Sequence, residues 1–314
     1  MFAAIALLCL LGPLLGDYPR YVVTLWLIYS MATLGMNYVM GFGKLYALGH
    51  GGFMLVGAYV VAAGINHWHW HPAVALAVSA VLAAAVGILI GLPAIRLKLL
   101  SLAIVTFAFA SMLFQVVKSV DFLGGPQGLY IDASALPPQG SLTLWYVVVV
   151  LTVLALAMSH SLINSRSGRA LLIIAVNEHV ARSFGVNVTY HKLAAFAFAA
   201  VLGAVAGGLL GMVTGYVAPD TFNTDLSITI FAAVMIGGRG KLLGPFLGAA
   251  FIVALPELTQ QARNLSQFIY AIAFLLIVSF FPDGLLGMVT AAWRKVARPT
   301  GTSASFKKLE ESQS

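Results

Sequence analysis

Cysteine and charged residues are scarce in this chain, and their scarcity excludes several classes of protein. The one cysteine, Cys9, lies in an apolar run, so a single chain builds neither a disulfide framework nor a cluster of thiolate metal ligands. Only 9% of the residues are charged and 61% are hydrophobic, which with a mean hydropathy of +0.96 leaves too little polar surface to cover a water-soluble globule. The net charge of +7 does not indicate nucleic-acid binding, because the basic residues flank hydrophobic runs. This composition predicts a polytopic membrane protein.

Ionisable groups are nearly absent from the centres of the hydrophobic runs. Proton-driven and sodium-driven transporters usually place a carboxylate or histidine relay at mid-membrane. Here the acidic residues of the hydrophobic region fall at or beyond the ends of the runs, namely Asp17, Asp121, Asp132, Asp220, Asp225, Glu257 and Asp283. This placement weakens the alternative of an ion-coupled secondary transporter and indicates that energy is supplied from elsewhere.

The sequence also lacks a nucleotide-binding P-loop. That motif is G-x-x-x-x-G-K-[ST], whose backbone amides hold phosphates and whose hydroxyl holds magnesium. The two Gly-Lys pairs, at 43–44 and 240–241, are each followed by leucine and lack the upstream glycine. We therefore assign no catalytic residue and expect no cofactor.

A run of alternating histidine and tryptophan, HWHWH at 67–71, has two interpretations. If extended, it would place three imidazoles on one side, which is a conceivable metal arrangement. It also lies at a predicted external membrane edge, where tryptophan is favoured, and no carboxylate is near it in the sequence. We favour an aromatic interfacial belt and assign no metal site.

Hydrophobic runs of the length that crosses a ~30 Å hydrocarbon core predict an all-α polytopic protein with about 8–10 transmembrane helices, some of them short or broken. The candidate spans are 2–16, 22–40, 51–66, 72–95, 99–117, 143–159, 192–216, 226–238, 242–256 and 266–282. Segments 51–66, 226–238 and 242–256 are short and rich in glycine, so neighbouring protein has to satisfy their backbone, and some are expected to be re-entrant or broken.

The basic residues predict the orientation. If the polar loop 160–192 is cytoplasmic, all but three of the 17 basic residues lie on its side of the membrane. The exceptions are Arg20, Lys118 and Arg263. The positive-inside rule then places both termini in the cytoplasm. The chain divides into a transmembrane domain, 1–293, which includes this loop, and a tail, 294–314, whose polar composition predicts a flexible cytoplasmic segment.

The loop 160–192 carries the pattern of a short amphipathic helix. No proline or glycine occurs from Arg169 to Phe184, and Gly185 follows as a helix stop. The apolar stripe at helical spacing consists of Leu172, Ala175, Val176, His179 and Val180. A helix joined to membrane spans can transmit a displacement. The alternative is a helix that lies on the lipid surface, with Arg166, Arg169 and Arg182 at phosphate level.

Glycine is concentrated inside the membrane region, in residues 41–63 and 237–249. It implies close backbone approach, a broken helix or a hinge, and it also leaves room for a solute. The two stretches share G-x-G-K-L, at 41–45 and 238–242, which is weak support for an internal repeat. The candidate residues of a translocation path or hinge are Gly41, Gly43, His50, Gly51, Gly52, Tyr59, Gly237, Gly238, Gly240, Gly244 and Gly248, with Gly124, Gly125 and Gly128 in the irregular external loop 118–142. For His50 and Tyr59 a packing role is the alternative.

Four segments in order give a specific resemblance. They are GFGKLYALGHGGFMLVGAYVVAA at 41–63, LGGPQGL at 123–129, GRALLIIAVNEHVARSFGVNVTYHKLAAFAFAAVLGAVAGGLLG at 168–211 and MIGGRGKLLGPFLGAAF at 235–251. The chain resembles the permease subunits of branched-chain amino-acid ABC transporters, and most closely the M-type permease of the Leu/Ile/Val import family.

The resemblance implies a non-catalytic subunit of an ATP-driven importer in the bacterial cytoplasmic (inner) membrane. Its implied partners are a homologous permease subunit, two ABC ATPase subunits, a periplasmic solute-binding protein and membrane lipid, with no nucleic acid. Solutes of such permeases are branched-chain or other amino acids, or urea and short amides. The loop 160–192 would be the segment that couples to the ATPase. Asn177, Glu178, Ala181 and Gly185 match its motif, with Arg182 between them, whereas His179 and Val180 depart from the strict Ala-Ala form.

Overall fold

The chain folds into a bundle of long α-helices in a computed structural model, which describes residues 12–13, 15–95, 97, 99–132, 134, 136–137, 141–258 and 284–287. Five segments are long and apolar enough to cross a membrane: Asp17–Phe42, Pro72–Pro93, Leu100–Ser119, Leu142–Asn164 and Val188–Thr214. They confirm an all-α, multi-pass membrane protein. Cys9, the expected span 266–282, the tail 294–314 and most of the expected span 2–16 lie outside the described residues.

The helices follow one another along the chain, and the connection between α5 and α6 is a long one. Their bounds are α2 Asp17–Asn37, α3 His50–Trp68, α4 Pro72–Ala94, α5 Leu99–Ser119, α6 Leu142–Asn164, α7 Arg166–Val176, α8 Glu178–Ser183, α9 Val188–Thr214, α10 Thr224–Gly237 and α11 Gly244–Leu258. A π-helix, η1 (Tyr38–Phe42), continues α2. Such π-turns are rare and often occur at functional sites.

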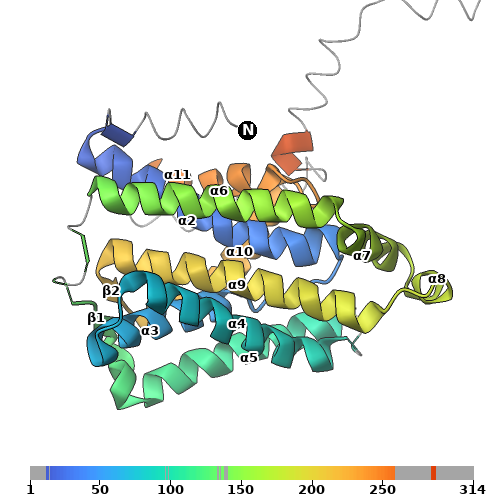
Figure 1. Cartoon of the computed structure of the whole chain (residues 1–314), viewed down its shortest axis with the longest axis horizontal. Helices are drawn as coiled ribbons and strands as arrows, with labels where there is room; N and C mark the ends of the chain where they lie inside the picture. Colours follow the sequence, from blue (N-terminus) through green and yellow to red (C-terminus); the bar gives the residue numbers. More distant parts are fainter. Residues whose placement is uncertain are drawn as a thin grey trace, which may run out of the picture.

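Helix α9 lies at the centre and packs against α2, α3 and α4 (Figure 1). Its crossing with α3 is close enough to require glycine. A β-carbon on Gly57 would lie 1.9 Å from the carbonyl oxygen of Ala204, and one on Gly207 would lie 2.0 Å from that of Met54. Helices in lipid gain no hydrophobic driving force for association, so their association depends on close van der Waals packing. Small residues such as these glycines allow that close approach.

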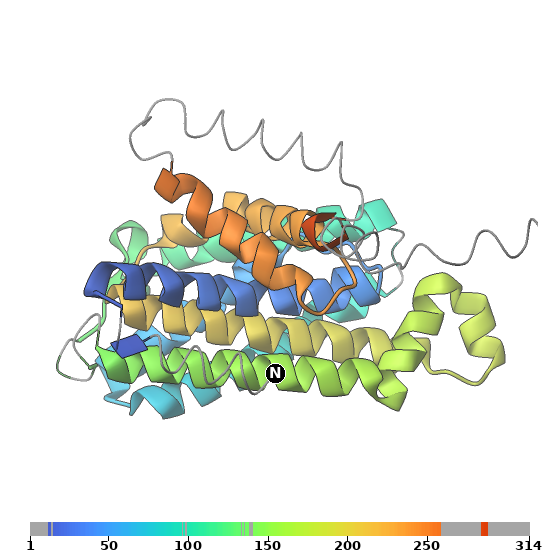
Figure 2. The same ribbon diagram turned by 90° about the horizontal axis from the view of Figure 1, so that it is seen from above.

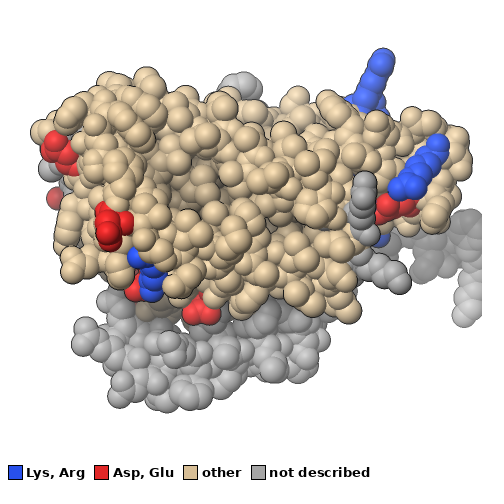
Figure 3. All heavy atoms as spheres, turned by 90° about the horizontal axis from the view of Figure 1, so that it is seen from below, with Lys and Arg blue, Asp and Glu red and all other residues tan. Residues whose placement is uncertain are grey.

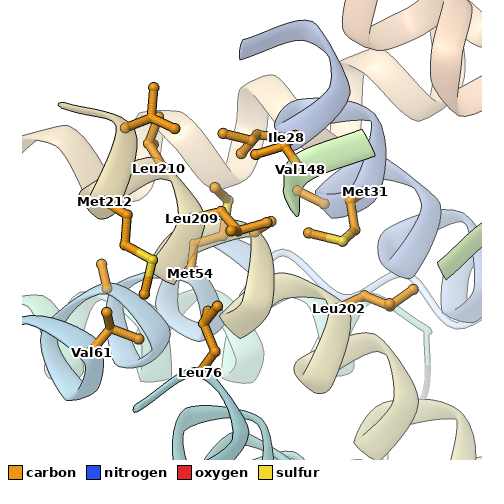
Figure 4. Close-up of a cluster of buried hydrophobic side chains, with 14 of the residues drawn as sticks. Ile28, Met31, Met54, Val61, Leu76, Val148, Leu202, Leu209, Leu210 and Met212 are labelled. Carbon is orange, nitrogen blue, oxygen red and sulfur yellow. The ribbon is translucent and has the colours of Figure 1, made fainter. Parts of the chain in front are cut away.

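Around this crossing the core is built mainly from aliphatic and methionine side chains of several helices. Figure 4 shows Met31 of α2, Met54 of α3, Val148 of α6 and Leu209 of α9 meeting there. All four are buried, at 1% exposure or less. The peripheral helices differ, since side chains of α4 and α5 such as Val81 and Leu100 are exposed and face the space that lipid or a partner would occupy.

Helices α10 and α11 are short, with 14 and 15 residues. At 1.5 Å per residue they span about 21 to 23 Å, less than the ~30 Å core of a bilayer. They pack on each other through glycine, since a β-carbon on Gly248 would lie 2.0 Å from the carbonyl oxygen of Ala233 and one on Gly237 the same distance from that of Gly244. Figure 2 shows α11 crossing α2, where the indole of Trp26 donates to the carbonyl of Phe246 at 2.8 Å.

One end of the bundle carries a small antiparallel ladder that the sequence did not predict. β1 (Leu129–Tyr130) pairs with β2 (Tyr216–Val217), with Leu129 opposite Val217. The loop 118–142 was expected to be irregular, and two-residue strands are too short to show an alternating pattern. The 3₁₀ turns η2 (Asp121–Leu123), η3 (Gly125–Gln127) and η4 (Pro219–Phe222) surround the ladder.

Charged side chains lie at the two ends of the bundle and not between them on the face that Figure 3 shows. In the described part of the chain, the end with the strands carries Asp17, Arg20, Lys118, Asp121, Asp132, Asp220, Asp225 and Glu257. The opposite end, where α7 and α8 project in Figure 1, carries Lys44, Arg166, Arg169, Glu178, Arg182, Lys192, Arg239 and Lys241. We call these the acidic end and the basic end.

Candidate functional site

The segment between α6 and α9 consists of two helices that meet at Asn177. Asn177 has an extended backbone (φ −159°, ψ 116°), and its Oδ1 accepts hydrogen bonds from the N–H groups of His179 at 2.9 Å and Val180 at 3.3 Å. It ends α7 and caps α8 at once. The prediction of one continuous helix over 169–184 is therefore wrong, because asparagine favours an N-cap over a helix interior.

Buried side chains fix α7 and α8 to the bundle. Gly168, Leu171 and Ile174 face inward on α7. Ala181 of α8 is fully buried and packs with Ile174 and with Val188 at the start of α9. Gly185 follows α8 with φ +74°, and a β-carbon there would meet no described residue within 4 Å, so the left-handed backbone is what favours glycine.

The outer face of the segment is apolar and uncovered. Val176 is 81% exposed and Phe184 is 76% exposed, and Leu172, Ile173 and Val180 are exposed beside them. We call these five residues the exposed stripe. Three of them, Leu172, Val176 and Val180, belong to the predicted amphipathic face. Apolar side chains gathered at the end of a molecule usually mark a surface that a partner or lipid covers.

An ion pair that the sequence did not predict joins the segment to α9. The ammonium of Lys192 donates to the carboxylate of Glu178, and the Lys192 side chain is 4% exposed against 40% for Glu178. A buried lysine needs such a partner, because an unpaired charge is costly to desolvate. The side chain of Arg182 is exposed on the same helix.

The two G-x-G-K-L motifs meet at the basic end. Asn37, which is fully buried, joins them: its Nδ2 donates to the carbonyl of Lys241 at 3.0 Å and its Oδ1 accepts from the N–H of Gly240 at 2.9 Å. A β-carbon on Gly41 would lie 2.4 Å from the nitrogen of Gly240. Sequence reasoning missed Asn37, although an asparagine in an apolar run directly before the first motif is a usable signal.

Helix α7 contacts the π-helix η1, which leads into the first of the two G-x-G-K-L motifs. Leu171 of α7 packs in one buried cluster with Tyr38 and Val39 of η1. A β-carbon on Gly43 would approach the same Leu171 side chain to 3.6 Å. Across the loops, the guanidinium of Arg239 donates to the hydroxyl of Tyr46 at 2.8 Å. The segment 166–183 and the two motifs therefore form one contiguous region.

The glycines at the start of α3 lie where helices approach closely. The N–H of Gly51 donates to the hydroxyl of Ser227 of α10 at 2.9 Å, and a β-carbon there would lie 2.6 Å from that oxygen. A β-carbon on Gly52 would be 3.2 Å from the Cα of Ala110 of α5. These positions are tightly packed in this structure.

His50 lies in a notch between α2 and α9 and is 2% exposed. β-carbons on Gly35 and Gly203 would approach its ring to 3.2 and 3.1 Å, and Phe53 packs edge-on with ring centres 5.9 Å apart. Within the described part of the chain, no group makes a hydrogen bond of normal geometry with the Nε2 of His50. In this arrangement the imidazole fills space between helices.

At the acidic end, predicted residues surround the ladder. The hydroxyl of Tyr59 donates to the carbonyl of Val217 at 3.4 Å. Gly124, Gly125 and Gly128 all have left-handed backbones, with φ of 79°, 53° and 77°. They shape the turns that bring the strand β1 to β2. The structure thus places predicted path residues at both ends of the bundle, and it packs His50, Gly51 and Gly52 between neighbouring helices such as α5 and α9.

The three histidines of the run 67–71 take different roles. His67 stacks on Phe122, with ring centres 4.1 Å apart. His69 ends α3 with φ 50°, and His71 caps α4 by accepting from the N–H of Ala73. Trp68 stacks with Trp70 at 5.1 Å. These aromatic contacts agree with the interpretation of an interfacial belt.

Five helices of spanning length, with the charge of the described residues gathered at the two ends of the bundle, define a multi-pass membrane protein. Residues 18–278 match the family described as branched-chain amino acid transport system / permease component. The chain belongs to this family. This confirms the resemblance to the permease subunits of branched-chain amino-acid ABC transporters.

Individual relatives agree. The chain is 29% identical over 296 residues to the high-affinity branched-chain amino acid transport system permease protein LivM of Escherichia coli (strain K12), covering 85% of this chain and 69% of that protein. It is 26% identical over 288 residues to the corresponding protein LivH of the same strain, covering 84% and 93%. A shorter match, 33% over 111 residues, links 33% of this chain to 32% of the autoinducer 2 import system permease protein LsrC of Klebsiella pneumoniae. No solved structure matches significantly.

Proposed function

We propose that this chain is a translocating subunit of an ATP-driven importer for branched-chain or related amino acids. The solute class is taken from the names of the relatives LivM and LivH, which are permease proteins of a branched-chain amino acid transport system. Similarity to two permease proteins of one strain supports pairing with a homologous permease subunit. Two ATPase subunits would supply the energy, and a periplasmic binding protein would deliver the solute. The subunit itself performs no covalent chemistry in this proposal.

We propose that the ATPase docks on the exposed stripe and couples its energy to the subunit there. Val176 and Phe184 present apolar surface at the tip of a segment whose inner face is firmly packed. An ATPase that covers this surface would move α7 and α8 together with the bundle. Asn177, Ala181, Gly185 and the Glu178 pair would maintain the shape of the segment, and Arg182 would add a contact at its surface. The lipid-surface alternative would leave the same side chains in the headgroup region.

A displacement of α7 has a physical route to the membrane region. Leu171 would push on Tyr38 and Val39 of the π-helix, and Asn37 would pass the movement to the loop 238–242. Packed elements that have two arrangements can transmit such coupling. The glycines of the two motifs would then act at the cytoplasmic entrance of the path.

The charge distribution supports the orientation. With the basic end in the cytoplasm, the segment 166–183 faces the ATPases and the ladder β1–β2 faces the binding protein. Both termini are then cytoplasmic, and the membrane is the bacterial cytoplasmic membrane. The acidic residues remain at the ends of helices, which supports ATP coupling over ion coupling.

The proposal is tested by uptake in liposomes that contain the chain, its partner permease and the ATPases, with the binding protein outside. We expect Val176→Asp to abolish ATP-dependent leucine uptake and ATPase co-purification, because a carboxylate cannot be buried unpaired at an apolar contact. Val176→Leu keeps the apolar surface and is the matched control. Glu178→Lys and Gly185→Pro should likewise abolish uptake while the subunit still inserts.

Two results would contradict the proposal. Normal co-purification and uptake with Val176→Asp would exclude the exposed stripe as the docking surface. Uptake by the purified chain alone, driven by a proton or sodium gradient, would establish a secondary transporter. A binding protein that co-purifies with the complex decides the solute: leucine, isoleucine or valine should stabilise it against heat, whereas urea and short amides should not.

A further inference from the structure

A cavity of about 580 Å³ lies at the basic end, between the segment 166–183 and the ends of the membrane helices. Its charged lining consists of Lys44, Arg182 and Lys192 against Glu178. Because Glu178 is paired with Lys192, the remaining charge of the lining is positive. In the described part of the chain, no acidic side chain lies within ion-pair distance of Lys44 or Arg182.

The backbone at Lys44 is unusual. Its φ is +51°, in the left-handed region that residues with a β-carbon seldom adopt. A glycine would adopt this conformation without a steric penalty, whereas the β-carbon of Lys44 makes it strained. Residues held in such conformations often belong to binding sites, where the surrounding structure maintains the strain. Here the result is an exposed lysine on the wall of the cavity.

The rest of the lining is mainly apolar and comes from the loop after η1, the junction of α4 and α5, and α7. It consists of Leu45, Ile95, Leu97, Leu102, Ile174 and Ala175, with Gly43 and Thr189. Leu97 stands between Arg96 and Lys98 in the sequence. Leu92 of α4 and Leu100 of α5 lie within three residues of the lining residues Ile95 and Leu102, and they are 52% and 78% exposed. A positive cavity lined in part by the α4–α5 junction, where apolar side chains are exposed, fits an amphiphilic anion.

We propose that this cavity binds the phosphodiester headgroup of an anionic phospholipid from the cytoplasmic leaflet. Lys44 and Arg182 contact the phosphate, and the acyl chains lie along α4 and α5. Basic pockets between membrane helices on the cytoplasmic side bind anionic headgroups by this chemistry. The inference rests on the proposed orientation. Since Glu178 and Lys192 also line the cavity, a bound lipid sits directly against α8.

The test measures lipid binding by the full-length chain and does not require transport. The protein is placed in nanodiscs of phosphatidylcholine with or without phosphatidylglycerol, and the lipid that survives detergent exchange is quantified by mass spectrometry. We expect phosphatidylglycerol to be enriched about tenfold over its share in the disc. The double variant Lys44→Asn, Arg182→Gln should lose this enrichment. Asparagine is chosen because it tolerates the left-handed backbone.

The matched control is Arg166→Gln, Arg169→Gln, which removes the same charge from the same end but from residues outside the cavity. It should keep the enrichment. Equal loss in both double variants would show a diffuse surface effect and overturn the site. Inorganic phosphate and glycerophosphoglycerol, added to phosphatidylcholine discs, test a soluble ligand, and thermal stabilisation by either to the same extent as by phosphatidylglycerol would overturn a lipid ligand.

Thermal unfolding of each variant in phosphatidylcholine shows whether it is folded. If the Lys44 and Arg182 double variant is unfolded, the wild-type chain provides the test. Its phosphatidylglycerol enrichment should fall in 0.5 M salt, and enrichment that this salt does not reduce would contradict a headgroup held by charge. Failure of this inference leaves uptake and its coupling unaffected, so it is distinguishable from failure of the proposed function.

Discussion

Replacing Asn37 by alanine removes the side chain that joins the two glycine-lysine-leucine loops at the basic end. Its amide bridges two main-chain groups of the loop 238–242, the N–H of Gly240 at 2.9 Å and the carbonyl of Lys241 at 3.0 Å. The amide is fully buried. The two groups differ, because the carbonyl of Lys241 also accepts from the N–H of Gly244 at 3.2 Å and would keep that bond.

The expected cost follows from this difference. A buried N–H left without an acceptor costs about 1 to 3 kcal/mol, and loss of one of two hydrogen bonds at a carbonyl costs about 1 kcal/mol. Asn37→Ala should therefore destabilise the folded state by about 2 to 4 kcal/mol. At about 2 °C per kcal/mol for a chain of this size, the unfolding temperature in detergent should fall by about 4 to 8 °C.

Asn66 provides the matched control. Its amide makes the same kind of bridge at the acidic end, with the carbonyl of Tyr130 at 2.6 Å and the N–H of Asp132 at 3.0 Å. Water can replace it there because the site is exposed, so Asn66→Ala should cost about 1 kcal/mol and about 2 °C. Equal shifts in the two variants, or an unchanged unfolding temperature for Asn37→Ala, would refute burial as the cause.

Two further predictions concern glycine. Gly57→Ala places a β-carbon 1.9 Å from the carbonyl oxygen of Ala204, so α3 and α9 must separate and the variant should aggregate in size-exclusion chromatography. Gly16→Ala should elute as wild type, because among the described residues its β-carbon meets only Pro19, at 3.9 Å. A monodisperse Gly57→Ala variant would contradict the packing. Gly185→Ala meets no neighbour but has to adopt φ +74°, which costs about 1 to 2 kcal/mol, whereas Gly185→Asn should lower the unfolding temperature less; equal losses would contradict a conformational origin.

Properties that depend on short stretches of sequence were predicted well. The expected span 72–95 is α4, Pro72–Ala94, since proline starts a helix and the apolar run defines its length. The shortness of 226–238 and 242–256 was likewise visible in the sequence. Asn177 itself was a local signal for the break between α7 and α8, because an asparagine side chain can cap a new helix in place of continuing the old one. The apolar stripe, which runs past this residue, favoured a continuous helix instead.

The candidate site was predicted only in part. The segment 160–192 and the glycine-rich motifs were identified, whereas the Glu178–Lys192 pair, the bridge by Asn37 and the ladder β1–β2 were not. Each of these joins residues that helices bring together from separate parts of the chain. The sequence shows a polar residue at such a position without showing its partner.

By itself, the sequence determined that this is a membrane protein with apolar helices of spanning length. It also determined that the basic residues lie mainly on one side of the membrane. These properties follow from the composition of each segment and its transfer into lipid. The tertiary structure decided which faces meet. It placed two motifs about 200 residues apart in contact through Asn37, and it turned the stripe of α7 and α8 outward. Those outcomes depend on close packing between distant helices, where small side chains and single hydrogen bonds select one arrangement.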